Sequence, residues 1–177
     1  IRQFLLLLGS PRFLNRKQKW VAFWKLNVQQ SGIINLDHIA KVCETLASSK
    51  TGALIVLSKK SNLEEFINNG ELIDARVSEQ LIENIFYKNS PLHDGAIIIS
   101  GNRIVAARCV LPLTRNENFP PTLGLRHRAA VGVSEITDAI TIVVSEQTGN
   151  ISYTKNGTLY AKIGPDALKA FLELEFA

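Results

Sequence analysis

One turn in this chain combines residue types that suit chemistry on a hydroxyl group or at a metal ion. Residues 90–96 read SPLHDGA and lead directly into an apolar run. Gly95 and Ala96 leave little bulk after Asp94, so that carboxylate can approach a hydroxyl or a metal closely. His93 adds a group that can bind metal or exchange a proton. An ordinary Asp-Gly turn with a surface histidine is the alternative explanation.

A second cluster, GLRHRAA, starts at Gly124 and opens a predicted helix with two guanidinium groups and an imidazole. Free backbone N–H groups and the dipole at a helix start attract anions, as do the side chains of Arg126, His127 and Arg128. Without an anion, cations at this position oppose the helix dipole. The cluster therefore predicts a phosphate site, with a solvated charge cluster as the alternative.

A third cluster begins with Ser145 and Glu146, directly after a predicted buried strand. Ligands of open α/β sheets gather beyond strand ends, where a serine can donate to a phosphate and a glutamate can hold a metal. Polar turns after strands are common, so this cluster alone says little. Together, the three clusters provide the groups needed for phosphoryl or nucleotidyl transfer, in which positioning and charge neutralisation do most of the catalysis.

Helices and short apolar strands are expected to position these clusters. Capping residues and apolar spacing predict helices at 35–49, 61–69 and 125–136. Two more helices are predicted, one after Ser78 and one that begins at residues 164–166. Apolar runs and glycine-containing turns predict strands at 51–57, 96–100, 103–111, 139–145, 151–155 and 158–161. This mixture predicts an α/β fold, with a mixed twisted central sheet flanked by helices in three layers.

The chain has 177 residues, of which 46% are hydrophobic and 20% charged, and these proportions exclude a disordered or fibrous protein. Its net charge of +4 is divided unevenly, because residues 1–36 hold six basic and no acidic residues while residues 37–177 carry −2. A nucleic-acid partner is not expected, since it would need a basic face on the folded body. Cys43 and Cys109 are too few for a disulfide framework, and we expect two buried thiols.

Residues 1–34 differ from the rest because they interleave the six cations with Trp20, Trp24 and three phenylalanines. This composition suits a membrane interface, and a peripheral helix pair that packs through its aromatic rings is the alternative. The longest apolar run, Phe4–Leu8, is far shorter than the ~20 residues of a transmembrane helix. The chain begins at Ile1 and contains no Met, so we expect it to be a fragment of a longer protein.

The motifs PLHDGAIII, GLRHRAA and ITIVVSE together resemble the diadenylate cyclase (DAC) domain, whose signature is the pair DGA and RHR. The likeness extends over about residues 35–161. Residues 1–34 resemble the stretch that follows the membrane helices in the membrane-anchored class of these cyclases. The resemblance thus implies a juxtamembrane helical segment, 1–34, and a catalytic domain, 35–177, at the cytoplasmic face of a membrane. It also implies a preceding membrane anchor and, as further partners, regulatory proteins.

The resemblance implies an enzyme that condenses two ATP molecules into cyclic di-AMP and releases two pyrophosphates, with Mg²⁺, Mn²⁺ or Co²⁺ as cofactor. Two protomers of a homodimer would face each other, so that each 3′-hydroxyl attacks the α-phosphate of the other ATP. Asp94 would activate or position the hydroxyl, with Gly95 and Ala96 against the nucleotide. The other implied site residues are Gly124, Leu125, Arg126, His127, Arg128 and Ser145 for phosphate, His93, Asp94 and Glu146 for metal, and Leu54 in the adenine pocket.

Three positions depart from the family pattern. Leu125 stands where relatives often carry Thr, Val110 where some carry Tyr near the base, and Gln147 where some carry a second Glu. Two other classes remain as alternatives. An HD-type phosphohydrolase would need more than the chain's three histidines and an all-helical fold, and a non-catalytic nucleotide-binding module would keep the arginines but lose the acid.

Overall fold

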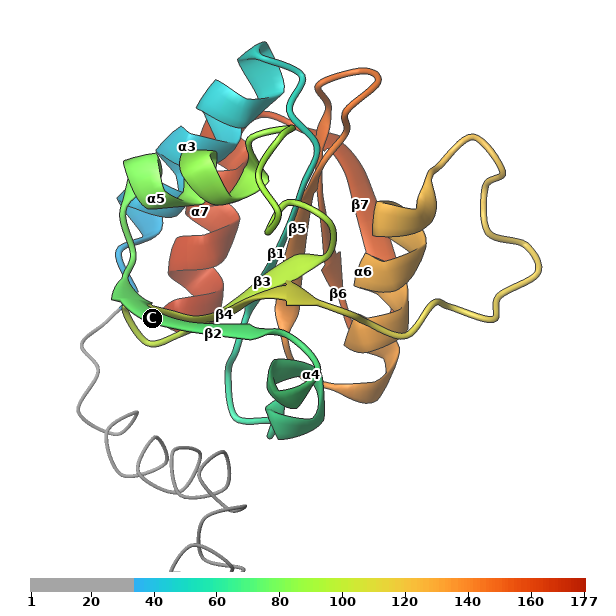
Figure 1. Cartoon of the computed structure of the whole chain (residues 1–177). Coiled ribbons are helices and arrows are strands. Elements are labelled where there is room, and N and C mark those ends of the chain that lie inside the picture. Colours follow the sequence, from blue (N-terminus) through green and yellow to red (C-terminus); the bar gives the residue numbers. More distant parts are fainter. Residues whose placement is uncertain (1–33) are drawn as a thin grey trace, which may run out of the picture. The chain divides into compact units, whose positions relative to one another are not determined.

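The computed structural model describes residues 34–177, which belong to one compact unit, Gly32–Ala177. The predicted juxtamembrane segment 1–34 lies outside the described residues except for Ile34. The helices are α3 (Leu36–Ser48), α4 (Glu64–Asn68), α5 (Glu79–Phe86), α6 (Leu125–Ile136) and α7 (Pro165–Phe176). The strands are β1 (Ala53–Leu57), β2 (Glu71–Arg76), β3 (Ala96–Ser100), β4 (Arg103–Cys109), β5 (Ile140–Val144), β6 (Ile151–Lys155) and β7 (Thr158–Ile163) (Figure 1).

The strands form one seven-stranded sheet in the order β2-β4-β3-β1-β5-β6-β7. β1 and β3 run parallel, and every other neighbouring pair is antiparallel. Ile55 pairs with Ile97 and Ala53 pairs with Val144. The starts of β1 and β3 and the end of β5 therefore lie at the same end of the sheet, which we call the site end.

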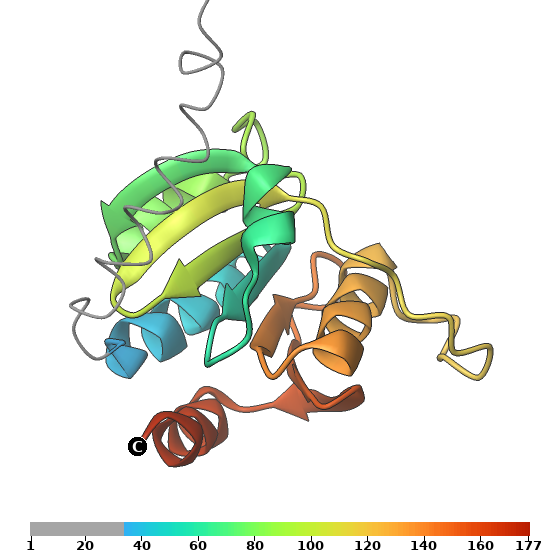
Figure 2. The same cartoon turned by 90° about the horizontal axis from the view of Figure 1, so that it is seen from below.

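The two faces of the sheet are covered by different helices, which confirms the predicted three layers. α3, α5 and α7 lie on one face and α6 lies on the other (Figures 1 and 2). The first face holds a continuous apolar core, in which Ile55 and Ile142 of the sheet join Phe86 of α5 and Leu172 of α7. Each such side chain contributes ~1.5–3 kcal/mol on burial, so this face supplies much of the stability.

Most of the predicted elements are confirmed. Asn35 caps α3 by accepting from the backbone N–H of His38, and Ser78 caps α5 in the same way. Cys43 and Cys109 are buried and not disulfide-bonded, as expected. Burial raises the pKa of each thiol to about 12.

The predicted capping box at Ser61 is wrong, because α4 begins only at Glu64. The Ser61 hydroxyl instead accepts from the backbone N–H of Asp138, whose carboxylate accepts from the Ser61 N–H in return. Strand β2 was not predicted; it is an edge strand with a bulge and mostly accessible residues, so it lacks an apolar alternation. The strand predicted to end at residue 111 ends at Cys109.

Candidate functional site

The three clusters predicted from the sequence meet at the site end of the sheet. Asp94 precedes β3, Glu146 follows β5, and Arg126 lies in the first turn of α6. The Nη1 atom of Arg126 lies 3.2 Å from Oε2 of Glu146, which joins α6 to the end of β5. Gly52, just before β1, lies beside this pair: a Cβ atom there would be 2.7 Å from Arg126 Nη1. Segments far apart in the chain thus form one surface.

Asp94 is exposed, and it has no hydrogen-bond or ion-pair partner within residues 34–177. The neighbouring His93 is held to the turn, because its ring Nδ1 lies 2.6 Å from the carbonyl oxygen of Ser90. A carbonyl only accepts hydrogen bonds, so Nδ1 carries the proton and Nε2 of the neutral ring keeps its lone pair. The turn therefore offers a free carboxylate and an imidazole nitrogen that can accept a proton or bind a metal.

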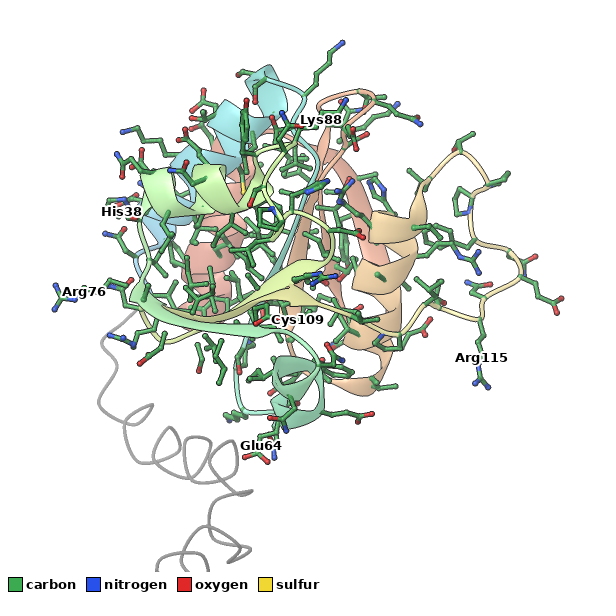
Figure 3. The ribbon with its side chains drawn as sticks, viewed as in Figure 1. His38, Glu64, Arg76, Lys88, Cys109 and Arg115 are labelled. Atoms are coloured by element: carbon green, nitrogen blue, oxygen red, sulfur yellow. The ribbon has the colours of Figure 1, made fainter. Side chains whose placement is uncertain are left out.

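Gly95 is required by its neighbours in the sheet. Its φ of +125° is rarely adopted by other residues, and a Cβ atom would lie 2.8 Å from the backbone carbon of Arg108 and 2.9 Å from the carbonyl oxygen of Cys109. Ala96 pairs with Cys109, which Figure 3 labels at the end of β4, and is completely buried. The small side chains at these two positions therefore fit β4, and Ala96 has no surface for a nucleotide in this structure.

Arg128 is fixed by the segment that precedes α6. Its Nη2 atom donates to the carbonyl of Thr114 at 3.3 Å, and the backbone N–H of Thr114 donates to the carbonyl of Arg128 at 3.0 Å. Gly132 allows this contact, since a Cβ atom there would lie 2.1 Å from the carbonyl oxygen of Pro112. The start of α6 is thus held between this segment and the sheet.

Two guanidinium groups at the start of α6 have unused hydrogen-bond donors. The Nε atoms of Arg126 and Arg128 are buried and lack a partner within the described part of the chain. A buried donor left unpaired costs ~1–3 kcal/mol, and an anion at this helix start would remove that cost. His127, which is 6% exposed, lies between the two arginines in the sequence, and its burial lowers its pKa. The arrangement suits a phosphate group.

The residues predicted to bind metal do not form a site by themselves. Within residues 34–177, no group of three or more His, Cys, Asp or Glu side chains is arranged to hold a metal ion, so His93, Asp94 and Glu146 are not gathered into one. Glu146 is turned toward Arg126 instead. The donor set still fits Mg²⁺, which typically takes one or two carboxylates and completes its shell with water and substrate phosphates.

Two further residues, predicted to contact the nucleotide, are less accessible than such a contact requires. Leu54 is 3% exposed within β1, and Ser145 is half-buried and accepts from the backbone N–H of Thr148. Sequence reasoning missed Gly52 and Thr114 as residues that position the arginines. Nothing local identifies either, since both act on residues of α6 that are more than ten positions away.

Within the described residues, no helix combines the length and apolar content that crossing a bilayer requires.

Comparison with known proteins identifies relatives over most of the chain. The family model described as DisA bacterial checkpoint controller nucleotide-binding, or DAC, matches residues 40–159. A cyclic di-AMP synthase, CdaA, of Bacillus subtilis is 40% identical over 176 residues, which are 99% of this chain and 62% of that protein. The chain thus spans less than two thirds of this relative.

Two solved structures are similar. A double variant of DacA from Staphylococcus aureus has a TM-score of 0.78 and 40% identity, over 80% of this chain and 94% of that one. A hypothetical membrane spanning protein from Bacillus cereus has a TM-score of 0.72 and 33% identity, over 92% of this chain and 84% of that one.

Proposed function

Because the chain belongs to the DAC family, we propose that it is the catalytic domain of a diadenylate cyclase. It condenses two ATP molecules into cyclic di-AMP and releases two pyrophosphates. The observation that carries the proposal is the site end of the sheet, where the unpaired carboxylate of Asp94 lies on the same surface as the guanidinium groups at the start of α6. The first is suited to a hydroxyl and the second to phosphates.

In the proposed reaction, the 3′-hydroxyl oxygen of one ATP attacks the α-phosphorus of the other. A new P–O bond forms, the bond to the β-phosphate oxygen breaks, and pyrophosphate leaves; the second attack closes the ring. Asp94 orients the attacking hydroxyl and accepts its proton. Asp94 and His93 Nε2 are the groups that would hold a Mg²⁺, Mn²⁺ or Co²⁺ ion, which would lower the pKa of the hydroxyl and neutralise phosphate charge when bound. Glu146 is a third ligand only if it leaves Arg126.

The phosphates are proposed to bind at the start of α6. Arg126 and Arg128 provide the charge, and their buried Nε atoms provide donors that have no other partner in the described chain. The backbone N–H groups of Leu125 and Arg126 add further donors, whereas those of His127 and Arg128 already donate to the carbonyl of Gly124. His127 contributes as a neutral group, because its burial disfavours a third positive charge. Ser145 contacts phosphate, and Leu54 lines the adenine pocket, only if neighbouring groups move.

A single site holds one ATP, so the reaction requires two protomers whose site ends face each other. We propose that a homodimer is the active form. Specific activity should then fall as the chain is diluted through the concentration range in which the dimer dissociates, with assembly measured by sedimentation in parallel. Constant specific activity of a demonstrated monomer would contradict this mechanism.

The direct test is product identification. The purified chain is incubated with ATP and each of Mg²⁺, Mn²⁺ and Co²⁺, and the products are identified by mass spectrometry. Cyclic di-AMP and pyrophosphate in a ratio of one to two are expected with at least one metal. ADP or AMP with every metal would exclude the cyclase and indicate an ATP hydrolase. Unchanged ATP with every metal would exclude the cyclase and favour a non-catalytic nucleotide-binding module.

The proposed location is the cytoplasmic face of a membrane, through an anchor that precedes Ile1. The support is the segment 1–34, which carries all its charges as cations among aromatic residues, as juxtamembrane stretches do. The name of the similar Bacillus cereus protein, which calls it membrane spanning, agrees with this placement. Regulatory proteins are further candidate partners.

A further inference from the structure

Arg108 lies beside the turn of Asp94 but belongs to none of the three clusters. It is the penultimate residue of β4, and its backbone lies against Gly95: a Cβ atom on Gly95 would be 3.0 Å from the Cα of Arg108. The side chain of Arg108 therefore starts one residue away from Asp94, at the site end of the sheet. Figure 3 marks the place by its neighbour Cys109.

The backbone at Arg108 has an unusual conformation. Its φ is +54°, a left-handed value that residues other than glycine adopt rarely. The pairing of β3 with β4 shifts here, because Ala96 pairs with Cys109 while Ile98 pairs with Ala106. β4 thus has one residue more than β3 over this stretch, which is a β-bulge. Bulges beside active sites redirect side chains, and strained residues persist there for function.

Arg108 also has a charge that nothing in the described chain neutralises. Its side chain is exposed and forms no ion pair or hydrogen bond with residues 34–177. Arg126, by contrast, is paired with Glu146, and Arg128 donates to Thr114. Of the three guanidinium groups at the site end, Arg108 is therefore the one that is unpaired and accessible.

We propose that Arg108 is a third phosphate-binding cation of the site and increases its affinity for ATP through the triphosphate. This rests on the proposed function insofar as ATP is the ligand. A charge-assisted contact between a guanidinium and a phosphate is strong, and the nearby carboxylate of Asp94 makes a cation useful where a polyanion must approach. No pattern in the sequence marks this arginine, because the bulge that places it is visible only in the sheet pairing.

The test measures binding by calorimetry for the unaltered chain and the variants Arg108→Gly, Arg108→Lys and Lys162→Gly. ATP, with a fixed concentration of Mg²⁺, and adenosine are the two probes. Glycine at position 108 removes the charge and suits the left-handed backbone, so the fold should be retained or stabilised. Lys162 is the matched control, because it is also an exposed cation with a left-handed φ, +58°, but lies in β7 at the opposite edge of the sheet.

We expect Arg108→Gly to raise the Kd for ATP about tenfold, which corresponds to ~1.4 kcal/mol, and to leave adenosine binding unchanged. Arg108→Lys should lose less, and Lys162→Gly should lose nothing. An ATP Kd within twofold of the unaltered chain, or an equal loss for ATP and adenosine, would overturn the proposal. If the chain makes no cyclic di-AMP but Arg108→Gly still weakens ATP binding selectively, the cyclase fails and this inference stands. A chain that binds no ATP overturns both.

Discussion

The turn of Asp94 and the start of α6 bring opposite charges to one end of the sheet, but the fold holds them in different ways. The Asp94 carboxylate is exposed and has no partner within residues 34–177. The α6 start is held by Thr114 and Glu146, and farther along by Thr141 and Thr154, which both donate to the carbonyl of Ala130 at 3.0 Å.

At the turn of Asp94 activity and stability depend on different residues, whereas at the start of α6 the same residues affect both. A change of side chain at Asp94 alters no buried contact. A change at Arg126 removes a cation that opposes the helix dipole and a buried donor without a partner, and it loses only the half-exposed pair with Glu146. A change at Arg128 also removes the hydrogen bond to the carbonyl of Thr114. We therefore expect substitution of Asp94 to remove activity with little change in the free energy of unfolding. Substitution of Arg126 should weaken ATP binding and raise the free energy of unfolding.

The largest expected effect is that of Asp94→Asn. The amide keeps the size of the carboxylate but cannot accept the hydroxyl proton, so we expect a loss of cyclic di-AMP synthesis of about 10³-fold, or ~4 kcal/mol. The melting temperature and the Kd for ATP in the absence of metal should change little. Asp166→Asn, the same change at an exposed acid of α7, is the control and should retain full activity. Normal turnover of Asp94→Asn would refute the assigned role.

The second prediction concerns Arg126→Met. Methionine replaces the aliphatic part of the side chain as far as Nε, but it removes the charge, the buried Nε–H and the half-exposed pair with Glu146. We expect ATP affinity to fall ~10–100-fold, while the free energy of unfolding rises by ~0.5–1 kcal/mol. Calorimetry with ATP and urea unfolding without it measure the two effects on the same preparation.

Arg115→Met provides the control for Arg126→Met, since Arg115 is an exposed cation that projects from the loop before α6 (Figure 3). It should change neither quantity. If Arg126→Met destabilised the chain as much as it weakened binding, the arginine would be a structural residue and the contrast with Asp94 would disappear.

Much of the fold could be predicted from the sequence because its signals are local. The caps at Asn35 and Ser78, the helix from Leu125 and the apolar run of β5 each depend on a few neighbouring residues. β2 escaped prediction because an edge strand needs no apolar alternation. The capping box predicted at Ser61 was wrong because the Ser61 hydroxyl accepts from Asp138, 77 positions away. Such a long-range contact overrides a local sequence pattern.

The candidate site was predicted in its parts but not in its assembly. The acid, the two arginines and Glu146 were each identified by type and spacing. Their meeting at one end of the sheet depends on the parallel pairing of β1 with β3 and the antiparallel pairing of β1 with β5, which no local pattern determines. The pairing of Glu146 with Arg126, and the burial of Ala96 and Leu54, follow from the same packing.

The third prediction tests how firmly α6 is held. Thr141→Val and Thr154→Val each remove one hydroxyl donor to Ala130 in a fully buried place, so each should lower the free energy of unfolding by ~1 kcal/mol. ATP affinity should fall slightly in the double variant, because the helix that carries both arginines is less constrained. Thr45→Val, at an exposed hydroxyl of α3, should have almost no effect. Equal effects at the three positions would show that the buried hydroxyls do not hold α6.

The smallest effect concerns pH and His127. Burial lowers the pKa of His127 in the folded chain below its usual 6.5, so below that pH the unfolded chain binds a proton that the folded chain resists. The stability that His127 contributes is complete above pH 6.5 and decreases as the pH falls from there toward the folded pKa. Urea unfolding between about pH 5 and 8 should therefore show a stability that rises with pH and then levels off. His127→Gln should flatten this slope, whereas an unchanged slope would mean that another group titrates. A phosphate beside α6 favours the protonated ring of His127, so saturating ATP should also reduce the dependence of the unfolding free energy on pH. The buried start of α6 would then respond to the same ligand on which Asp94 acts.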